Sequence, residues 1–479
     1  MRKTKLVCTL GPACDNKETL LKMINEGMNV ARINMSHGTH EEQKVRIDRL
    51  KEVIKESGKN VAILLDTKGP EVRVGTFENG SAQLIEGKEF YLYKDKNKVG
   101  NDEGVGISYP KLVDIFLNEK QEAIGRKILL DDGKINLVVT EVSSGAIKCL
   151  IVKGGWLSNR KSINIPDYHI SMPYVSAQDR SDIEFGLKNG AEFVAASFVR
   201  SADDVSTLRD YIDSIGFEGV DIISKIENQS GYDDIDRIIE ASNGIMVARG
   251  DMGVEIPFIK LPEIQKTIIR KTVAHGKYVI TATQMLESMT SNPLPTRAEI
   301  SDVANAVYDG TSAVMLSGES AAGKYPVESV KALNDICEEA ESNHEDYLLK
   351  KYIDEFNDSN SFRKSICYAA RNVAETVNAK AIIVESATGK VARAMAHFRP
   401  ECPIIAVVTS VLVQHKLCLG RGVTAVLGEN LTNTDEITKQ AIDKALETGI
   451  VKSGDTVVVI SSNKIEPSYG TDTLQIKVI

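Results

Sequence analysis

Residues 221–253 read DIISKIENQSGYDDIDRIIEASNGIMVARGDMG, and this stretch decides the fold. It predicts a short apolar strand ending in Lys225 and Glu227, an amphipathic helix, and a second apolar strand ending in the RGD triplet at residues 249–251. In parallel strands, residues two positions apart point to the same side, so Lys225 and Glu227 face one space and the next strand brings Asp251 beside them. One cation and two carboxylates therefore converge, and paired carboxylates suit a hard divalent ion such as Mg²⁺. The alternative is a surface salt bridge.

The same strand–helix rhythm begins at the N-terminus and resumes after Pro173. Short, almost continuous apolar runs alternate with helical stretches, a pattern typical of parallel strands that are buried on both faces. The predicted strands are residues 4–10, 29–35, 61–66, 193–199, 220–227, 244–251, 278–283 and 312–318. Eight such strands predict an α/β fold, the (β/α)8 TIM barrel, whose site lies at the carboxyl ends of the strands.

Two further regions depart from this rhythm. From Gly69 to about Pro166, alternating apolar residues and turn residues predict an inserted all-β region, with a hairpin turn at the Asp132-Gly133 pair. After a polar, acidic connector at residues 338–360, apolar strands alternate with helices and predict a smaller, open C-terminal α/β sheet. We expect three domains: a barrel formed by residues 1–69 and 171–340, a β-barrel-like lid at 70–170, and a C-terminal α/β domain at 341–479 with a regulatory or oligomerisation role.

Composition narrows the class of protein. At 479 residues the chain is long enough for about three domains. A net charge of −9 argues against a nucleic acid or an anionic membrane as partner, because proteins that bind these carry a basic surface. No run of about 18 apolar residues is present, so we expect no membrane span. Seven cysteines without a CxxC pair favour reduced thiols and a cytoplasmic protein.

The second predicted strand ends in polar side chains. Alternation places Arg32, Asn34 and Ser36 on one side of it, where a buried strand does not tolerate polar groups without a reason. Ser36 or Thr39 also fits the cap of the following helix. Capping leaves Arg32 and Asn34 unexplained, so we expect this strand end to belong to a site.

The third strand ends in Asp66-Thr67, followed by Lys68-Gly69-Pro70. Alone, this segment reads as a turn that leaves the domain. Together with the second strand it supplies neutral and singly charged oxygens, which suit a monovalent cation better than a second divalent ion. Arg32 and Arg73 suit phosphate, because a guanidinium group presents a planar fork of donors.

Two later strand ends carry further candidates. Thr283 follows the seventh strand, whereas Met285 and Met289 are spaced as core residues. In the C-terminal region, the loop at residues 386–390 joins a strand to a helix. Free amides at that helix start and Lys390 predict an anion site, and an ordinary strand-to-helix turn is the alternative.

Seven motifs occur in order along the chain: TLGPA, ARINMSHG, LDTKGPEVRVG, SKIEN, VARGDMGVE, TATQMLESM and VMLSGESA. Over essentially its whole length the sequence therefore resembles the pyruvate kinase family. The resemblance implies a TIM barrel with an inserted β domain and a C-terminal α/β domain, in a homotetramer. It also implies transfer of a phosphoryl group from phosphoenolpyruvate to ADP, giving pyruvate and ATP, with Mg²⁺ (or Mn²⁺) and K⁺.

The matching motifs also imply residue roles. The catalytic residues would be Lys225, Arg32 and Thr283, and the substrate would be bound by Arg32, Lys225, Gly250, Asp251 and Thr283. The nucleotide would be bound by Asn34, Ser36, His37, Arg73 and Lys161. The divalent ion would be held by Glu227 and Asp251, and K⁺ by Asn34, Ser36, Asp66 and Thr67. A sugar-phosphate or nucleotide effector would bind at Ser386, Thr388, Gly389 and Lys390.

The sequence departs from the family pattern at a few positions. Ser162 and Asp167 replace common glycines near Lys161. Glu71 matches the family form that depends on K⁺, where other members carry a lysine. Val391 closes the loop at residues 386–390, where members activated by sugar phosphates usually carry a hydroxyl.

The proton that reaches the enolate carbon has several candidate donors. Thr283 with an ordered water is one, and Ser317 and Glu319 are others. Two other functions also fit parts of the sequence. A Mg²⁺-dependent aldolase or lyase on the same barrel would explain the paired carboxylates, and a non-catalytic sugar-phosphate sensor would explain only the C-terminal region.

Overall fold

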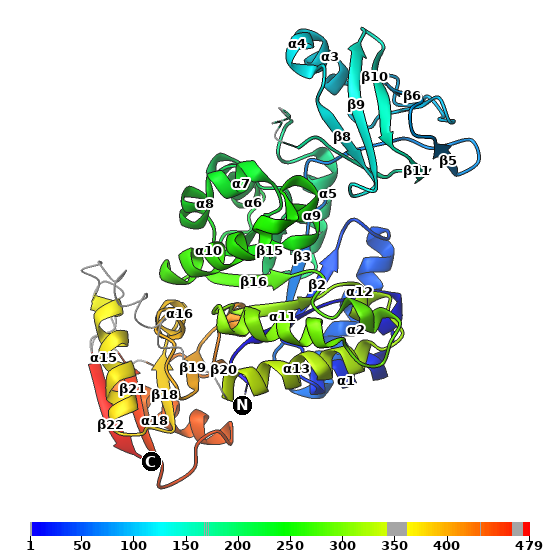
Figure 1. The fold of residues 1–479 in the computed structure, drawn as a ribbon. Helices are drawn as coiled ribbons and strands as arrows, with labels where there is room; N and C mark the ends of the chain where they lie inside the picture. Colours follow the sequence, from blue (N-terminus) through cyan, green and yellow to red (C-terminus); the bar gives the residue numbers. More distant parts are fainter. Residues whose placement is uncertain are drawn as a thin grey trace.

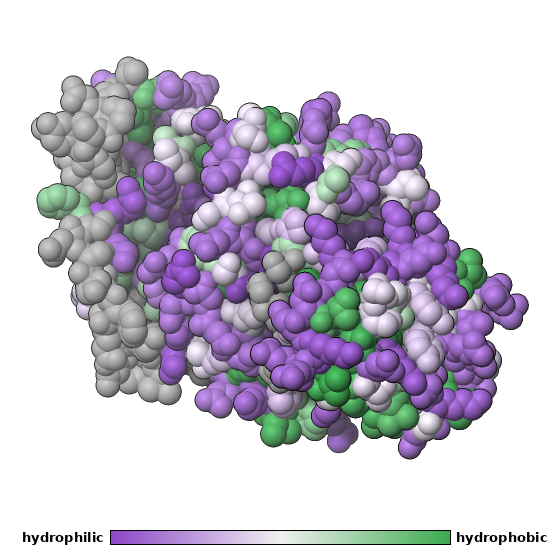
Figure 2. Space-filling model, turned by 90° about the horizontal axis from the view of Figure 1, so that it is seen from above, coloured by the Kyte–Doolittle hydropathy of each residue, from purple (hydrophilic) through white to green (hydrophobic). Residues whose placement is uncertain are grey.

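The computed structural model describes residues 2–166, 168, 170, 172–342, 362–431, 433–461 and 473–479. Asp167 and most of the predicted connector at residues 338–360 lie outside these ranges. In the described part of the chain, no helix combines the length and the apolar character that a membrane crossing requires. Seen from above, the surface is mostly hydrophilic (Figure 2).

Eight parallel strands close into a barrel, which confirms the predicted fold class (Figure 1). They follow one another around the barrel in the order β1-β17-β16-β15-β14-β13-β3-β2. Their bounds are β1 Lys5–Thr9, β2 Val30–Asn34, β3 Ala62–Asp66, β13 Phe193–Ala196, β14 Asp221–Ile226, β15 Gly244–Ala248, β16 Tyr278–Ala282 and β17 Ala313–Leu316. Buried apolar side chains such as Leu64, Phe193 and Met246 fill the interior, so the barrel is a packed core.

Helices surround the barrel and bury apolar faces against it. Their bounds are α1 Lys17–Asn25, α2 His40–Ser57, α5 Ala177–Lys188, α6 Ala202–Ser214, α7 Gln229–Asp233, α8 Ile235–Ala241, α10 Leu261–Ala274, α11 Arg297–Tyr308 and α13 Pro326–Ser342. Capping boxes fix where several begin, for example Thr39 with Glu42 at α2 and Thr296 with Glu299 at α11. Single-turn elements follow three strand ends, η1 Pro12–Cys14, η3 Glu287–Thr290 and α12 Gly318–Ala321, and a fourth, η2 Phe258–Lys260, directly precedes α10.

The stretch at residues 221–253 differs from its prediction in two details. The single predicted helix is divided into α7 and α8. The second strand ends at Ala248, and residues 249–251 begin a short helix, α9 Arg249–Glu255. Asp251 therefore lies in a first helical turn, where the helix dipole favours a carboxylate.

The inserted region forms a separate unit beside the barrel (Figure 1). It contains a seven-stranded sheet in the order β4-β12-β8-β9-β10-β6-β7 and a two-stranded sheet, β11-β5. The strands are β4 Val72–Arg73, β5 Ser81–Leu84, β6 Glu89–Tyr93, β7 Gly104–Gly106, β8 Lys127–Leu130, β9 Ile135–Val142, β10 Ala146–Lys153, β11 Gly155–Ser158 and β12 Ser162–Asn164. β8 and β9 form the predicted hairpin around Asp132-Gly133. Two helices that the strand pattern did not predict, α3 Lys111–Asn118 and α4 Lys120–Ala123, also belong to this unit.

The C-terminal unit is a five-stranded sheet in the order β20-β19-β18-β21-β22, with β22 antiparallel to β21. Its elements are α15 Phe362–Thr376, β18 Ala381–Glu385, α16 Lys390–His397, β19 Ile404–Val408, α17 Val411–Lys416, η4 Leu417–Leu419, β20 Val423–Leu427, α18 Thr434–Glu447, β21 Thr456–Ser461 and β22 Thr473–Val478. Polar contacts tie it to the amino-terminal ends of the barrel strands. Asp221 forms ion pairs with Arg393 at 2.9 Å and with Lys416 at 2.6 Å. The His415 ring lies 2.6 Å from the Glu192 carboxylate.

Candidate active site

Lys225 occupies the centre of the polar cluster at the carboxyl ends of the barrel strands. Its Nζ lies 2.9 Å from Oε1 of Glu227 and 3.2 Å from Oδ1 of Asp66. It also donates to the Ser197 hydroxyl at 2.7 Å. Lys225 is 8% exposed and Glu227 is fully buried. Because both side chains are buried, the pair is not a surface salt bridge, which was the alternative interpretation of the sequence.

Electrostatics in the cluster favour a cation between the carboxylates. Burial raises the pKa of Glu227, and the negative charge of Asp251 adds to this effect, against the pull of Lys225. Burial lowers the pKa of Lys225, but Asp66 and Glu227 outweigh it, so that pKa lies above its ordinary value. Two carboxylates that repel each other in a buried site match a divalent ion.

Glu227 and Asp251 by themselves form an incomplete set of metal ligands. In the part of the chain that the structure describes, no three carboxylate, histidine or cysteine side chains gather into a metal site. Glu227 and Asp251 would thus supply two oxygens, and water and substrate would supply the rest, which is how Mg²⁺ is usually bound. The residues present fit a divalent ion that binds together with a phosphorylated substrate.

Arg32 reaches the same cluster from β2. Its Nε donates to Asp66 at 2.6 Å and its Nη1 donates to the Thr9 hydroxyl at 2.9 Å. Within the described residues, no hydrogen bond or ion pair occupies Nη2. Burial raises the pKa of Asp66, but Arg32 and Lys225 outweigh that effect and hold the pKa below its ordinary value. Asp66 therefore stays ionised and fixes the two cations.

The four oxygen-bearing residues predicted to bind a monovalent ion lie on two neighbouring strand ends. Asn34 and Asp66 are register partners on β2 and β3. Asn34 Oδ1 accepts from the Ser36 amide at 3.0 Å, and Thr67 Oγ1 accepts from the Ser197 amide at 3.1 Å. One charged and three neutral side chains in this position suit a weakly charged cation.

Thr283 adopts a strained backbone conformation after β16. Its φ is 67° and that of Gln284 is 54°, and positive φ is an outlier for a β-branched residue. The Thr283 hydroxyl accepts from the Gly250 amide at 2.9 Å. Arg249 holds the strained turn, because its Nη2 donates to the Thr283 carbonyl at 2.6 Å while Nη1 pairs with Asp302 at 2.7 Å. The Arg249 side chain thus contacts Asp302 and the Thr283 carbonyl and holds the Thr283 turn in place.

A cavity of about 1,070 Å³, counting the space open to solvent, adjoins the cluster. Arg32, Asn34 and His37 line it, together with Ser317. Burial lowers the pKa of His37, and the charges of Arg32, Arg73 and Lys68 lower it further. A neutral His37 beside several cations favours a polyanionic ligand here.

Arg73 and Lys161 lie on the inserted unit and do not line this cavity. Arg73 pairs with Glu71 at 2.7 Å and donates to the Arg160 carbonyl at 3.0 Å. Lys161 pairs with Asp131 at 2.8 Å. Asp167, one of the departures near Lys161, lies outside the described residues. The structure therefore brings Asn34 and His37 to the cavity and leaves these two cations on the inserted unit.

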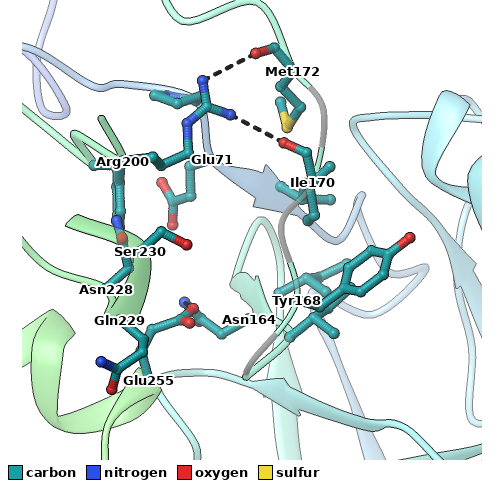
Figure 3. Close-up of a pocket in the computed structure, with 15 residues that line it drawn as sticks. Glu71, Asn164, Tyr168, Ile170, Met172, Arg200, Asn228, Gln229, Ser230 and Glu255 are labelled. Carbon is teal, nitrogen blue, oxygen red and sulfur yellow. Dashed lines mark hydrogen bonds between the residues drawn. The ribbon is translucent and has the colours of Figure 1, made fainter. Parts of the chain in front are cut away.

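A second pocket lies where the inserted unit joins the barrel (Figure 3). Arg200 is the connecting residue. Its guanidinium donates to the carbonyls of Ile170 at 3.0 Å and Met172 at 3.1 Å, and pairs with Asp204 at 2.9 Å. Arg200 therefore ties the segment that returns from the lid to the barrel.

The loop at residues 386–390 forms the turn between β18 and α16. Ser386 Oγ accepts from the Val391 amide at 3.3 Å, and Gly389 has a φ of 72°, which glycine adopts without strain. Thr388 and Lys390 are exposed. The turn leaves these two side chains accessible to a ligand, so both interpretations of the loop remain compatible with its geometry.

Several residues of the cluster escaped the sequence interpretation. Ser197 and Thr9 each bond a predicted site residue, and a lone hydroxyl at the end of an apolar strand is the only signal they carry. The two proton-donor candidates that the sequence did indicate, Ser317 and Glu319, also lie here, and Glu319 accepts the amides of Leu286 and Ser317 at 3.1 and 2.7 Å. Its carboxylate thus joins two strand ends. The Ser317 hydroxyl has no partner among the described residues.

Comparisons with known proteins agree with this geometry. The family described as pyruvate kinase, barrel domain, matches residues 1–330, and pyruvate kinase, alpha/beta domain, matches residues 364–477. The chain is 43% identical to a pyruvate kinase of Geobacillus stearothermophilus, covering 100% of this chain and 80% of that one. It is 43% identical to one from Clostridium acetobutylicum, with 100% of both covered. A crystal structure of a Cryptosporidium parvum pyruvate kinase matches with a TM-score of 0.92 and 36% identity, over 100% of this chain and 96% of that one. The chain belongs to the pyruvate kinase family.

Proposed function

We propose that Lys225, Arg32 and Thr283 carry out the reaction of this family at the carboxyl end of the barrel. The reaction moves the phosphoryl group of phosphoenolpyruvate to ADP and gives pyruvate and ATP. The buried Lys225 is the main support, because its ammonium lies among Asp66, Glu227 and Ser197. A fixed charge in a buried site stabilises developing negative charge without reorganising first.

The family requires a divalent ion and K⁺ in general. Glu227 and Asp251 would hold Mg²⁺ or Mn²⁺, which would offset phosphate charge when bound. K⁺ would take the oxygens of Asn34, Ser36, Asp66 and Thr67. The fit of both donor sets to their ions supports these assignments.

The chain's own groups then have separate tasks. Arg32 binds the phosphate of phosphoenolpyruvate through Nη2 of its guanidinium group, because Asp66 accepts from Nε and Thr9 accepts from Nη1. The backbone amide of Asp251 holds the substrate carboxylate at the first turn of α9, beside Gly250 and Thr283, which are already joined by a hydrogen bond.

Lys225 offsets charge on the moving phosphoryl group and then on the enolate oxygen. The enolate carbon takes its proton on the Thr283 side, through an ordered water, and the unpartnered Ser317 hydroxyl is the alternative donor.

ADP occupies the cavity lined by Asn34 and His37, with Ser36 nearby. Arg73 and Lys161 approach its phosphates when the lid, residues 70–170, closes on the barrel of residues 1–69 and 171–340. The C-terminal unit, residues 341–479, contributes an effector site for a sugar phosphate or nucleotide at the loop of residues 386–390 and joins subunits into a homotetramer. Seven free cysteines support a cytoplasmic location.

One assay tests the proposal: formation of pyruvate and ATP from phosphoenolpyruvate and ADP, with and without Mg²⁺ and with K⁺, Na⁺ or Li⁺ as the monovalent ion. We expect turnover that requires Mg²⁺ and is fastest in K⁺. Absence of pyruvate under every condition would reject the active-site assignment. Equal rates in the three monovalent ions would reject the K⁺ site alone.

A further inference from the structure

A basic cavity lies between the barrel and the C-terminal unit, far along the strands from the active site. It measures about 350 Å³, part of it open to solvent. The barrel contributes Lys277 and Tyr278, and the C-terminal unit contributes Arg393, His397, Arg399 and Arg421. Figure 1 shows α16, which carries two of these residues, between the C-terminal sheet and the barrel. A ligand here would contact both units at once.

The ionisable side chains that line the cavity are mainly basic. Lysine, arginine and histidine side chains line it, and no carboxylate does among the described residues. Asp221 lies nearby, but it already pairs with Arg393 and Lys416 at 2.9 and 2.6 Å. One carboxylate therefore serves two of the cations at this junction, Arg393 and Lys416.

Lys277 lies close to Arg393. Burial lowers the pKa of Lys277, and the positive charge of Arg393 lowers it further, against opposing effects of Asp221 and Glu240. Its Nζ donates to the Ser242 carbonyl at 2.7 Å and to the Glu240 carbonyl at 3.4 Å, and an ammonium group has three donors in all. The third donor of Lys277 is thus available to an anion, which would relieve the repulsion from Arg393.

The chemistry of the lining selects the ligand class. Guanidinium groups match the oxygens of phosphate through paired donors, and an ammonium group adds a compact charge. The volume of the cavity includes space open to solvent, so its enclosed part suits a group as small as phosphate and little more. A larger ligand would extend through the open side.

We propose that this cavity binds a phosphate group, either as inorganic phosphate or as the head of a phosphate monoester, and thereby bridges the barrel and the C-terminal unit. The site is distinct from the loop at residues 386–390, which lies at the other end of α16. It is also distinct from the cluster around Lys225. β14 begins at Asp221 beside the cavity and ends near Lys225.

Direct binding tests the proposal without relying on catalysis. The full-length chain is titrated calorimetrically with inorganic phosphate, and separately with glycerol 3-phosphate, at constant ionic strength with chloride as the reference anion. All measurements are made in an Arg32→Gln background, which removes phosphate binding in the active site. We expect a saturable site that remains after Lys390→Gln, which removes a cation of the loop at residues 386–390. Lys277→Gln should weaken it about tenfold or more, because a charge-assisted contact is lost, whereas Lys277→Arg should retain it.

Amide hydrogen exchange on the unsubstituted chain gives a second measurement that does not depend on how the variants fold. Phosphate should slow exchange in α16 and at residues 276–279. The proposal is overturned if protection appears only at the strand ends around Lys225 or at residues 386–390, or if chloride has the same effect as phosphate. Tighter binding of glycerol 3-phosphate than of inorganic phosphate would identify a monoester as the ligand, and the reverse order would identify the free ion.

Discussion

Replacing Lys225 by methionine tests the active-site assignment most directly. The substitution removes the ammonium from contacts of 2.9 Å to Glu227, 3.2 Å to Asp66 and 2.7 Å to Ser197. Loss of one preorganised electrostatic donor costs about 10² to 10³ in kcat, or roughly 3–4 kcal/mol. We expect a reduction of that size at saturating phosphoenolpyruvate, ADP, Mg²⁺ and K⁺.

The same substitution also affects folding. Removing one partner of a buried ion pair usually costs about 3–5 kcal/mol. Asp66 keeps Arg32 at 2.6 Å, and Glu227 keeps the Phe198 amide at 2.6 Å. We therefore expect the lower end, about 3 kcal/mol, which corresponds to a fall in Tm of about 6–12 °C. Differential scanning calorimetry measures this fall in Tm.

The kinetic assay couples pyruvate formation to a dehydrogenase and is run below the transition of the variant. Lys148→Met is the matched control, because Lys148 pairs with Glu89 at 2.8 Å on the surface of the inserted unit and should leave kcat unchanged. A folded Lys225→Met enzyme that keeps more than about a tenth of the wild-type kcat would contradict the role given to Lys225.

Three further substitutions test other parts of the structure. Arg249→Leu should lower kcat/KM for phosphoenolpyruvate by about tenfold or more, because it releases the Thr283 turn, whose positive φ stores about 1–3 kcal/mol. Arg200→Leu should speed amide exchange at Met172, because the Met172 amide donates to the Ile170 carbonyl, which loses the arginine that holds it in place. Burial raises the pKa of Glu385 from 4.5 to about 7. Between these two pH values the folded state keeps a proton that the unfolded state has lost, so the free energy of unfolding falls as pH rises from 4.5 to 7. Glu385→Gln should remove that fall and, after allowance for partial exposure, should be more stable than the wild type at pH 8 by about 1–2 kcal/mol.

Two of these substitutions, Arg200→Leu and Glu385→Gln, have a matched control. Arg237→Leu removes an exposed arginine that pairs with Asp234 and should leave exchange at the lid segment unchanged. Glu447→Gln removes an exposed carboxylate beside Lys444 and should leave the pH dependence of Tm intact. Unchanged kcat/KM in Arg249→Leu, unchanged exchange in Arg200→Leu, or a Glu385→Gln advantage of equal size at pH 5 and pH 8 would each contradict the corresponding argument.

Local pattern determined the architecture. Eight short apolar runs with helices between them predicted the barrel, and all eight strands occur, because burial on both faces requires apolar residues that any window of sequence displays. Alternation likewise placed Lys225 and Glu227 on one side of β14. The hairpin at Asp132-Gly133 followed from turn chemistry alone.

Tertiary structure decided the remaining features. The direction of Arg249, the left-handed backbone at Thr283 and the contact of Ser197 with Lys225 depend on neighbours that lie tens of residues away in sequence. The basic cavity is assembled from two units and has no signal in either alone. Residues 221–253 predicted which charges the barrel would carry at its strand ends. Their burial, their shifted pKa values and their partners arise only when eight strand ends meet, because the electrostatics of a charge depend on everything packed around it.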